Sequence, residues 1–310
     1  MTSRPVTAVV FAYHQIGVRC LSVLLAGGVD VRLVVTHRDS ATETIWWQSV
    51  AGLAGHAGIP VIMPDDPNDP EVVSRVDDCA PDFIFSFYYR HLLTLDMLNV
   101  PNRGAFNLHG SLLPRYRGRV PVNWVLINGE SETGVSLHRM VIKPDAGALV
   151  DQESVTILPN DTAHELFLKL VCAAERLLQR LLPDLLAGSW REYPLDLSAG
   201  SYFGGRRPED GRVDWSQTAW KIHNLIRAVA PPYPGAFSDL AGRRLQIYGS
   251  YWRGESGTGD NNRIYWQSGR CFVDCSDGKR IELSHIAVDG EPLDELAFLN
   301  IFGSELKVGP

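Results

Sequence analysis

The chain carries the sequence FNLHGSLLPRYRGR at residues 106–119. Within it, Asn107 and His109 are separated by one residue and follow a short apolar run. Because residues two apart on a β-strand point to the same face, these two side chains are predicted to face one cleft. The chain then turns through Gly110 and Pro114 into a loop that holds three arginines. We therefore expect a site that stabilises an oxyanion next to a site that binds a polyanion.

Strand and helix signals alternate through the first half of the chain. Short apolar runs predict strands at residues 6–13, 29–36, 59–63, 83–87 and 104–109. Between them, helical patterns lie at residues 17–25, 44–57 and 71–79. This alternation predicts an α/β fold with a doubly wound, mostly parallel, Rossmann-like sheet that has helices on both faces. Ligands of such sheets bind beyond the carboxyl ends of the strands, which is where Asn107 and His109 are placed.

The second half of the chain changes character after a segment rich in Gly, Ser, Arg and Pro. Before this segment we predict a helix at 121–128, strands at 133–141 and 149–157, and a long amphipathic helix at 162–186. After it, we predict a helix at 215–229 and short strands at 244–252, 263–267, 271–275 and 280–288. The predicted domains are an α/β domain at 1–197, a linker at 198–212, and a C-terminal helix with a small, mostly-β, OB-like or barrel-like domain at 213–310.

Composition and charge limit the class of protein further. A chain of 310 residues with 45% hydrophobic residues can bury a full core, and its net charge of -7 argues against a nucleic-acid partner. The five cysteines are an odd number without a tight framework, so we expect free thiols and no metal site. The sequence has no apolar run of about 20 residues and no signal-peptide pattern. We therefore expect a cytoplasmic protein without membrane insertion, for which an oligomer is possible.

Several common catalytic and cofactor motifs are missing. The residues after the first predicted strand, Gln15-Ile16-Gly17, do not form the Gly-x-Gly-x-x-Gly fingerprint, so we expect no NAD despite the doubly wound pattern. The sequence also lacks the lysine motif of a phosphate-binding P-loop. Ser111 is not surrounded by a Gly-x-Ser-x-Gly elbow, which argues against a hydrolase triad.

Asp145 and the arginines of the loop each have two interpretations. Asp145 lies in a Pro-Asp-Ala-Gly turn and could simply form that turn. If the fold brings it beside His109, its charge would instead raise the pKa of that histidine and fix the orientation and tautomer of the ring. The arginines could form a solvated basic loop, or they could recognise phosphate or carboxylate groups.

These residues resemble a known family. Asn107-x-His109, the Ser-Leu-Leu-Pro-x-Tyr-Arg-Gly motif at 111–118 and the later Asp145-Ala-Gly are similar to the formyltransferases that use 10-formyltetrahydrofolate. The resemblance covers about residues 6–250 and is weak beyond them. It extends to further stretches at 9–14, 85–92, 123–130, 137–140, 227–229 and 233–237.

The resemblance implies a reaction and roles for residues of the α/β domain. A formyl group would move from 10-formyltetrahydrofolate to the 4-amine of a UDP-linked amino sugar, UDP-4-amino-4-deoxy-L-arabinose. The product would serve the modification of lipid A or another surface polysaccharide, a change associated with polymyxin resistance. Asn107 and a protonated His109 would donate hydrogen bonds to the formyl oxygen, and His109 would act as general acid. Asp145 would hold His109 and keep it protonated.

The resemblance also implies contacts with both substrates. The folate contacts would be His91, Leu92, Leu93, Arg119, Val141, Ile142, Lys143, Pro144 and Asp145. Candidates for the sugar nucleotide, chosen from their positions, are Tyr13, Arg206 and Tyr233. Among the loop arginines, Arg119 has the specific role, whereas Arg115 and Arg117 are expected to be solvated or to shape the loop.

Three alternatives remain open from the sequence. The acceptor could be a different nucleotide amino sugar, because motifs shared by all such enzymes do not separate the two. It could also be methionyl-tRNA, although the net charge of -7 argues against a tRNA-binding surface. An interpretation of a different class is a folate-binding protein without catalytic activity.

Overall fold

The computed structural model describes residues 4–41, 43–259 and 261–309, and these divide into two compact units. The first unit comprises the chain up to Pro121 together with Thr133–Val155 and Leu168–Phe203. The second comprises Val122–Glu132, Thr156–Phe167 and the chain from Gly204 onward. Each unit is built from several segments, whereas the sequence predicted two domains and a linker that follow one another along the chain.

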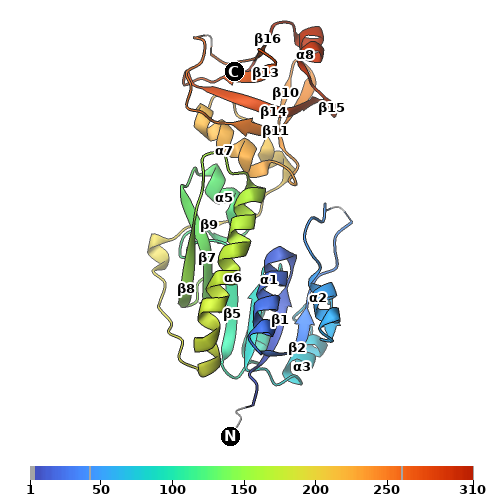
Figure 1. The fold of residues 1–310 in the computed structure, drawn as a ribbon, viewed down its shortest axis with the longest axis vertical. Coiled ribbons are helices and arrows are strands. Elements are labelled where there is room, and N and C mark those ends of the chain that lie inside the picture. The colour runs from blue at the N-terminus through green and yellow to red at the C-terminus, as the bar shows by residue number, and fades with distance from the viewer. Residues whose placement is uncertain (1–3, 42, 260, 310) are drawn as a thin grey trace. The chain divides into compact units, whose positions relative to one another are not determined.

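The first unit is organised around a mixed sheet of seven strands in the order β3-β2-β1-β4-β5-β7-β8 (Figure 1). The strands are β1 (Thr7–Ala12), β2 (Asp30–Val35), β3 (Val61–Ile62), β4 (Phe83–Phe87), β5 (Gly104–His109), β7 (Glu132–Arg139) and β8 (Leu149–Thr156). Strands β1 to β5 pair in parallel, and β7 pairs antiparallel to β5. Every residue of the central strand β1 is buried, as a strand covered on both faces requires.

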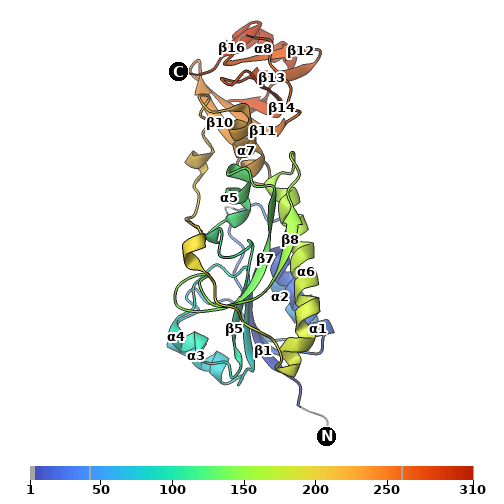
Figure 2. The same cartoon turned by 90° about the vertical axis from the view of Figure 1, so that its left-hand side faces the viewer.

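Helices cover both faces of this sheet. They are α1 (His14–Ala26), α2 (Val50–His56), α3 (Pro70–Asp77), α4 (Leu95–Leu98) and most of α6 (Ala163–Ala187), whereas α5 (Pro121–Ile127) belongs, from Val122 on, to the second unit. Figure 2 shows α1 and α6 on one face of the sheet and α3 and α4 on the other. A bidentate ion pair joins α1 to α6. Arg19 donates from Nε and Nη2 to the carboxylate of Glu175, at 2.8 Å each. The predicted doubly wound α/β class is therefore confirmed.

The second unit combines a helix with an antiparallel sheet. Its elements are α7 (Ala219–Val229), β10 (Ala236–Leu240), β11 (Arg243–Tyr251), β12 (Arg263–Gln267), β13 (Arg270–Asp274), β14 (Arg280–Val288), β15 (Glu291–Pro292), α8 (Glu295–Phe302) and β16 (Glu305–Lys307). The strand order is β10-β11-β14-β13-β12-β16, with β15 paired to β14. One hydrophobic cluster packs α7, through Ile222 and Ile226, against inward residues of the sheet such as Ile247. The predicted C-terminal β domain is confirmed.

Most differences from the predicted elements concern their ends. The helix predicted at 44–57 begins only at Val50, because the Ser49 hydroxyl accepts a hydrogen bond from Gly52 N and caps it. The helix predicted at 215–229 begins at Ala219, where Thr218 caps it in the same way. The sequence analysis did not predict α4, α8, β10, β15, β16 or the two-stranded pair β6 (Arg117–Gly118) and β9 (Tyr202–Phe203). These are short elements or elements whose pairing partner is far away in the sequence.

Two chemical features of the described residues bear on the expected class of protein. None of their helices combines the length and apolar character needed to span a lipid bilayer. All five cysteines are free thiols.

Candidate active site

Strand β5 carries Asn107 and His109 to the end of the central sheet. The alternation of the strand points Phe106 and Leu108, 0% and 1% exposed, into the core. Asn107 and His109 therefore share the opposite face, as the sequence predicted. His109 is itself buried, with 7% of its surface exposed.

Asp145 reaches this pair from the connection between β7 and β8. Its Oδ1 lies 3.5 Å from Nδ1 of His109 and 3.5 Å from Nε2 of His138. Its Oδ2 accepts a hydrogen bond from Gly118 N at 2.8 Å. A β-carbon on Gly147 would collide with the Arg139 carbonyl, so the glycine lets this turn approach β7 closely enough to deliver Asp145. The structure thus brings Asn107, His109 and Asp145 together.

The hydrogen-bond partners of His109 determine its tautomer. Nε2 lies 2.8 Å from the Tyr116 carbonyl oxygen, which can only accept, so Nε2 carries a hydrogen. Nδ1 consequently faces Asp145. Burial lowers the pKa of His109 below its ordinary value, and Asp145 and the Tyr116 carbonyl offset this only in part. Asp145 thus acts on the pKa of His109 in the expected direction, but burial of the ring has the larger effect.

Asp145 shows the opposite balance of effects. Burial alone would raise the pKa of its carboxyl group, but His109, His138 and the Gly118 amide together lower it to about 2. The carboxylate is therefore ionised throughout the neutral range. It is positioned to stabilise a positive charge on a neighbouring imidazole whenever one forms.

His138 is a member of the site that the sequence analysis did not assign. It lies directly opposite Asn107 in the pairing of β5 with β7 and is 2% exposed. Its Nδ1 donates to the Arg139 carbonyl at 2.9 Å, and its Nε2 lies 3.1 Å from Nδ2 of Asn107. Because an amide nitrogen can only donate, Nε2 of His138 acts as the acceptor. The antiparallel register that places His138 here is a tertiary feature without a local sequence signal.

The residues predicted to contact folate lie in two loops of the first unit. His91, Leu92 and Leu93 follow β4, and Val141, Ile142, Lys143 and Pro144 follow β7. Met140 and Leu93 pack against the same hydrophobic cluster, which connects the two loops. Leu92 and Ile142 expose 69% and 57% of their surfaces. The loops therefore present apolar side chains to solvent near the candidate site.

The three loop arginines differ in exposure. Arg115 and Arg119 are exposed, whereas Arg117 is buried, with 8% exposed. Of the two expected alternatives, Arg117 is therefore not solvated, which leaves a role in shaping the loop. The loop is fixed because β6 pairs with β9 and the Tyr116 ring stacks on Phe203 at 5.1 Å between centroids.

The three candidates for the sugar nucleotide lie in both units. Tyr13, in the first unit, lines a hollow of about 260 Å³ together with His37, Asp39 and Trp47. Its hydroxyl donates to Oδ1 of Asp39 at 2.8 Å. Arg206 and Tyr233 belong to the second unit, where the guanidinium of Arg206 lies 4.9 Å above the ring of Trp124. The role of these residues toward a substrate stays a prediction.

Models of protein families match both parts of the chain. The model described as "Formyl transferase" matches residues 20–182, and that described as "Formyl transferase, C-terminal domain" matches residues 206–303. The first match alone covers more than half of the chain. The chain belongs to the formyl transferase family and is an enzyme of that class.

Solved structures of this fold include sugar-modifying enzymes. An N-formyltransferase from Helicobacter canadensis, in complex with folinic acid and dTDP-3-aminofucose, is 20% identical with a TM-score of 0.71, covering 90% of this chain and 98% of that chain. WlaRD, a sugar 3N-formyl transferase in the presence of dTDP and 5-N-formyl-THF, is 20% identical with a TM-score of 0.72, covering 91% and 98%. HypX from Aquifex aeolicus in complex with tetrahydrofolic acid is 15% identical with a TM-score of 0.64, covering 94% and 46%. At these identities the likeness establishes the fold.

Proposed function

We propose that this formyltransferase moves a formyl group from 10-formyltetrahydrofolate to the 4-amine of UDP-4-amino-4-deoxy-L-arabinose. The observation that carries the proposal is the buried cluster of Asn107, His109 and Asp145 at the end of β5. Two of the similar structures contain a formyl-folate together with a thymidine diphosphate or its amino sugar, which supports a nucleotide-linked amine as acceptor. The choice of UDP and of the 4-amino sugar rests on the sequence resemblance.

In the proposed reaction the amine nitrogen forms a bond to the formyl carbon while the bond from that carbon to N10 of the folate breaks. The amine must lose a proton, and N10 must gain one. The lowered pKa of His109 favours its neutral form, whose Nδ1 lies beside Asp145, so together they offer a place for the proton that leaves the amine. The imidazolium formed beside the carboxylate then returns the proton to N10 as a general acid, a role worth about 10²–10⁴ in rate.

Asn107 has a separate role in the proposal. Negative charge develops on the formyl oxygen in the transition state, and the amide hydrogens of Asn107 are positioned to stabilise it. One amide hydrogen is already directed to Nε2 of His138, at a nitrogen–nitrogen distance of 3.1 Å. This contact fixes which end of the amide carries the donors and leaves the second hydrogen for the oxyanion. We therefore assign His138 as a positioning residue that acts through Asn107.

The role of His138 is tested by comparing two variants. His138→Ala removes the acceptor and is expected to lower kcat about tenfold, with KM for both substrates nearly unchanged, because the lost interaction acts in the transition state. His138→Gln keeps an oxygen acceptor and is expected to retain more of the rate. Equal kcat values in wild type and in His138→Ala would remove this role.

The two exposed apolar loops are the proposed folate site. Leu92, Val141 and Ile142 are apolar side chains that a flat pterin ring would cover, which removes apolar surface from water. The exposed Arg119 is proposed to contact the folate, and a guanidinium suits its carboxylates. Tyr13, Arg206 and Tyr233 remain the proposed contacts of the sugar nucleotide.

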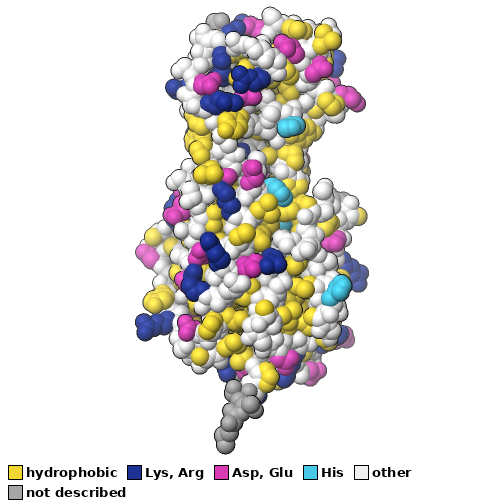
Figure 3. All heavy atoms as spheres, viewed as in Figure 1, with side chains coloured by type: hydrophobic (Ala, Val, Ile, Leu, Met, Phe, Trp, Pro, Cys, Tyr) yellow, Lys and Arg dark blue, Asp and Glu magenta, His cyan; other side chains and the backbone are white. Residues whose placement is uncertain are grey.

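Charge distribution helps to separate this proposal from methionyl-tRNA formylation. On the face drawn in Figure 3, Lys and Arg side chains are interspersed with Asp and Glu. Together with the net charge of -7, this favours a small acceptor over a large polyanion, which is bound through many unopposed cations.

The proposed function is tested by an acceptor panel. Purified protein and 10-formyltetrahydrofolate are incubated with UDP-4-amino-4-deoxy-L-arabinose, with dTDP-3-aminofucose, or with methionyl-tRNA, and each acceptor is analysed by mass spectrometry. We expect the UDP sugar to gain the mass of one carbonyl group. Formylation of only the thymidine-linked sugar would overturn the choice of acceptor, and formylation of only the tRNA would overturn the sugar class. Folate binding without turnover of any acceptor would favour the non-catalytic alternative.

A further inference from the structure

Arg117 is a buried cation that the structure leaves without a counter-charge. It is 8% exposed, and its Nε hydrogen has no acceptor among the described residues. None of the ion pairs formed by the described Asp and Glu side chains includes it. A buried charge without a partner costs several kcal/mol, so a fold that keeps one needs a compensating reason.

Arg227 is also a deeply buried arginine, and its guanidinium is hydrogen-bonded within the protein. Arg227 is 2% exposed, and its guanidinium donates to Oδ1 of Asn224 at 2.9 Å and to the carbonyl oxygens of Leu158 and Asp161 at 3.1 Å each. These oxygens satisfy Arg227 within the protein. Since this chain can satisfy a buried guanidinium in that way, the unsatisfied Arg117 points to an acceptor supplied from outside.

The backbone around Arg117 is part of the candidate active site. The preceding residue, Tyr116, accepts the hydrogen bond from His109, and the following residue, Gly118, donates to Asp145. Arg117 N itself donates to the Ser201 carbonyl at 3.0 Å within the β6–β9 pair. Its main chain is therefore fixed beside the catalytic pair, so binding a ligand would require little ordering of the protein.

We propose that Arg117 binds an oxyanionic group of a substrate, either a phosphate or a carboxylate. A guanidinium presents parallel donors whose geometry matches both groups. The proposal rests on the proposed function, which supplies two sources of this chemistry: the diphosphate of the sugar nucleotide and the carboxylates of the folate. No Asp or Glu among the described residues forms an ion pair with Arg117, so its guanidinium is available to either source.

The experiment compares Arg117→Met, which keeps the length of the side chain without its charge, with Arg117→Lys, which keeps the charge without the fork. Thermal unfolding is measured without ligand and with inorganic pyrophosphate, and affinities for UDP and for 5-formyltetrahydrofolate are measured separately by calorimetry. We expect Arg117→Met to unfold at the same temperature as wild type or higher, because an unpaired charge has been removed. We also expect it to bind one of the two ligands about 10- to 100-fold more weakly, as loss of a charged hydrogen bond implies. The affinity of Arg117→Lys for that ligand should lie between those of wild type and Arg117→Met.

The possible outcomes distinguish the diphosphate from the folate carboxylates, and they test the Arg117 site separately from the proposed function. Weaker binding of UDP identifies the diphosphate as the ligand group, and weaker binding of the folate identifies its carboxylates. If Arg117→Met binds both ligands as wild type does, the proposal is overturned, whether or not its unfolding temperature falls. Pyrophosphate should raise the unfolding temperature of wild type and not that of Arg117→Met. This readout does not depend on the acceptor, so Arg117 can be confirmed even if formyl transfer to the UDP sugar fails, and refuted even if transfer succeeds.

Discussion

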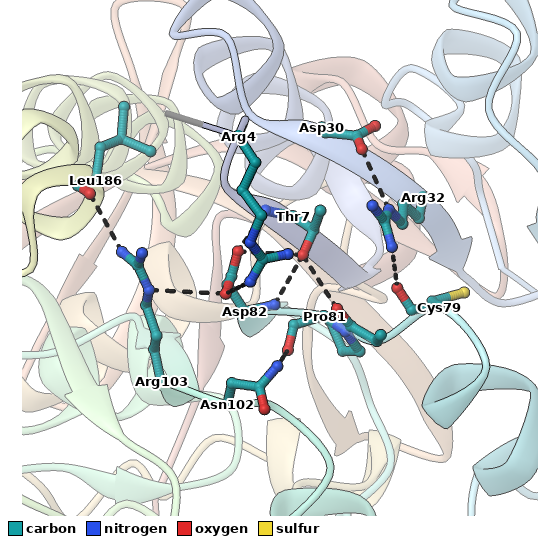
Figure 4. Close-up of polar contacts among 11 residues, drawn as sticks. Arg4, Thr7, Asp30, Arg32, Cys79, Pro81, Asp82, Asn102, Arg103 and Leu186 are labelled. Carbon is teal, nitrogen blue, oxygen red and sulfur yellow. Dashed lines mark hydrogen bonds and ion pairs between the residues drawn. The ribbon is translucent and has the colours of Figure 1, made fainter. Parts of the chain in front are cut away.

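Asp82 and Asp145 are both buried carboxylates of the first unit, but their partners differ in kind. Asp82 directly precedes β4 and has 3% of its side chain exposed (Figure 4). Its Oδ2 accepts from the Thr7 backbone at 3.0 Å and from the Thr7 hydroxyl at 3.2 Å. Its Oδ1 lies 2.9 Å from Nη2 of Arg4 and 3.7 Å from Nε of Arg103. Every partner of Asp82 is a group that keeps its hydrogen at any physiological pH.

The partners of Asp145 can change their protonation. Its carboxylate, 11% exposed, lies between the imidazoles of His109 and His138 and accepts a backbone hydrogen bond from Gly118. Histidine is the side chain whose charge changes most readily near neutral pH. The two sites lie at opposite ends of the parallel strands, since Asp82 precedes β4 and His109 ends β5. A buried aspartate held by arginine and backbone thus ties strands together, whereas one held by histidines can serve proton transfer.

The largest expected difference between the two aspartates is in catalysis. Asp145→Asn keeps the shape of the side chain but removes the charge that stabilises an imidazolium on His109. We expect kcat for formyl transfer to fall about 10³-fold, a loss in the range of an acid–base residue. Asp82→Asn is the matched control and is expected to change kcat by less than about threefold, because it leaves the proposed acid–base group untouched. Steady-state assays of both variants measure this difference. A similar loss of kcat in the two variants would contradict it.

The next largest difference is expected in the free energy of unfolding, and here the larger effect belongs to Asp82. Asp82→Ala leaves the Thr7 amide without its acceptor and Arg103 without its ion-pair partner, and we expect the free energy of unfolding to fall by about 3 kcal/mol. Arg4 is the exposed end of the same cluster, with 64% of its side chain in solvent. Arg4→Ala should therefore cost less than about 1 kcal/mol. Urea unfolding of both variants tests this order, which would be reversed if the surface ion pair carried the stabilisation.

The smallest expected effect concerns the pH dependence of stability. The pKa of Asp145 is lowered from 3.8 to about 2 in the folded protein. Because the folded value lies below the unfolded one, the stabilisation is complete above about pH 4 and is lost as the pH falls toward 2. The contribution amounts to about 2 kcal/mol. Urea unfolding of wild type and Asp145→Asn between pH 2 and 6 measures it.

The stability difference between these two proteins should shrink as the pH falls through this window. A difference that stays constant down to pH 2 would show that Asp145 is not stabilised in its ionised form.

Much of the fold could be predicted because its signals are local. The largely apolar segments at 83–87 and 104–109 coincide with β4 and β5, since buried parallel strands need apolar residues on both faces. The capping residues Ser49 and Thr218 carry local signals as well, but the predicted helices extend N-terminal of them and so begin too early. Strand β16 was missed because it is three residues long and is stabilised by pairing with β12, about 40 residues earlier.

The residues of the candidate site also fall into those that local sequence predicts and those that it does not. Asn107 and His109 could be recognised because their spacing on one strand fixes a common face. Neither His138 nor the burial of Arg117 could be recognised from the sequence. His138 depends on the register of β5 against β7, and Arg117 depends on the pairing of β6 with β9, which lies about 85 residues later.

The sequence by itself determined the α/β class, the strand that carries Asn107 and His109, and the residue types available for catalysis, because periodicity and spacing along one strand are local properties. Only the tertiary structure decided that Asp145 meets His109, that His138 contacts Asn107, and that the buried Nε of Arg117 has no acceptor among the described residues. It also decided that the pKa of His109 is lowered, because the loss of solvent around the ring outweighs the nearby carboxylate. Distances between residues far apart in the chain, and the water excluded from them, are set by packing and by no single segment.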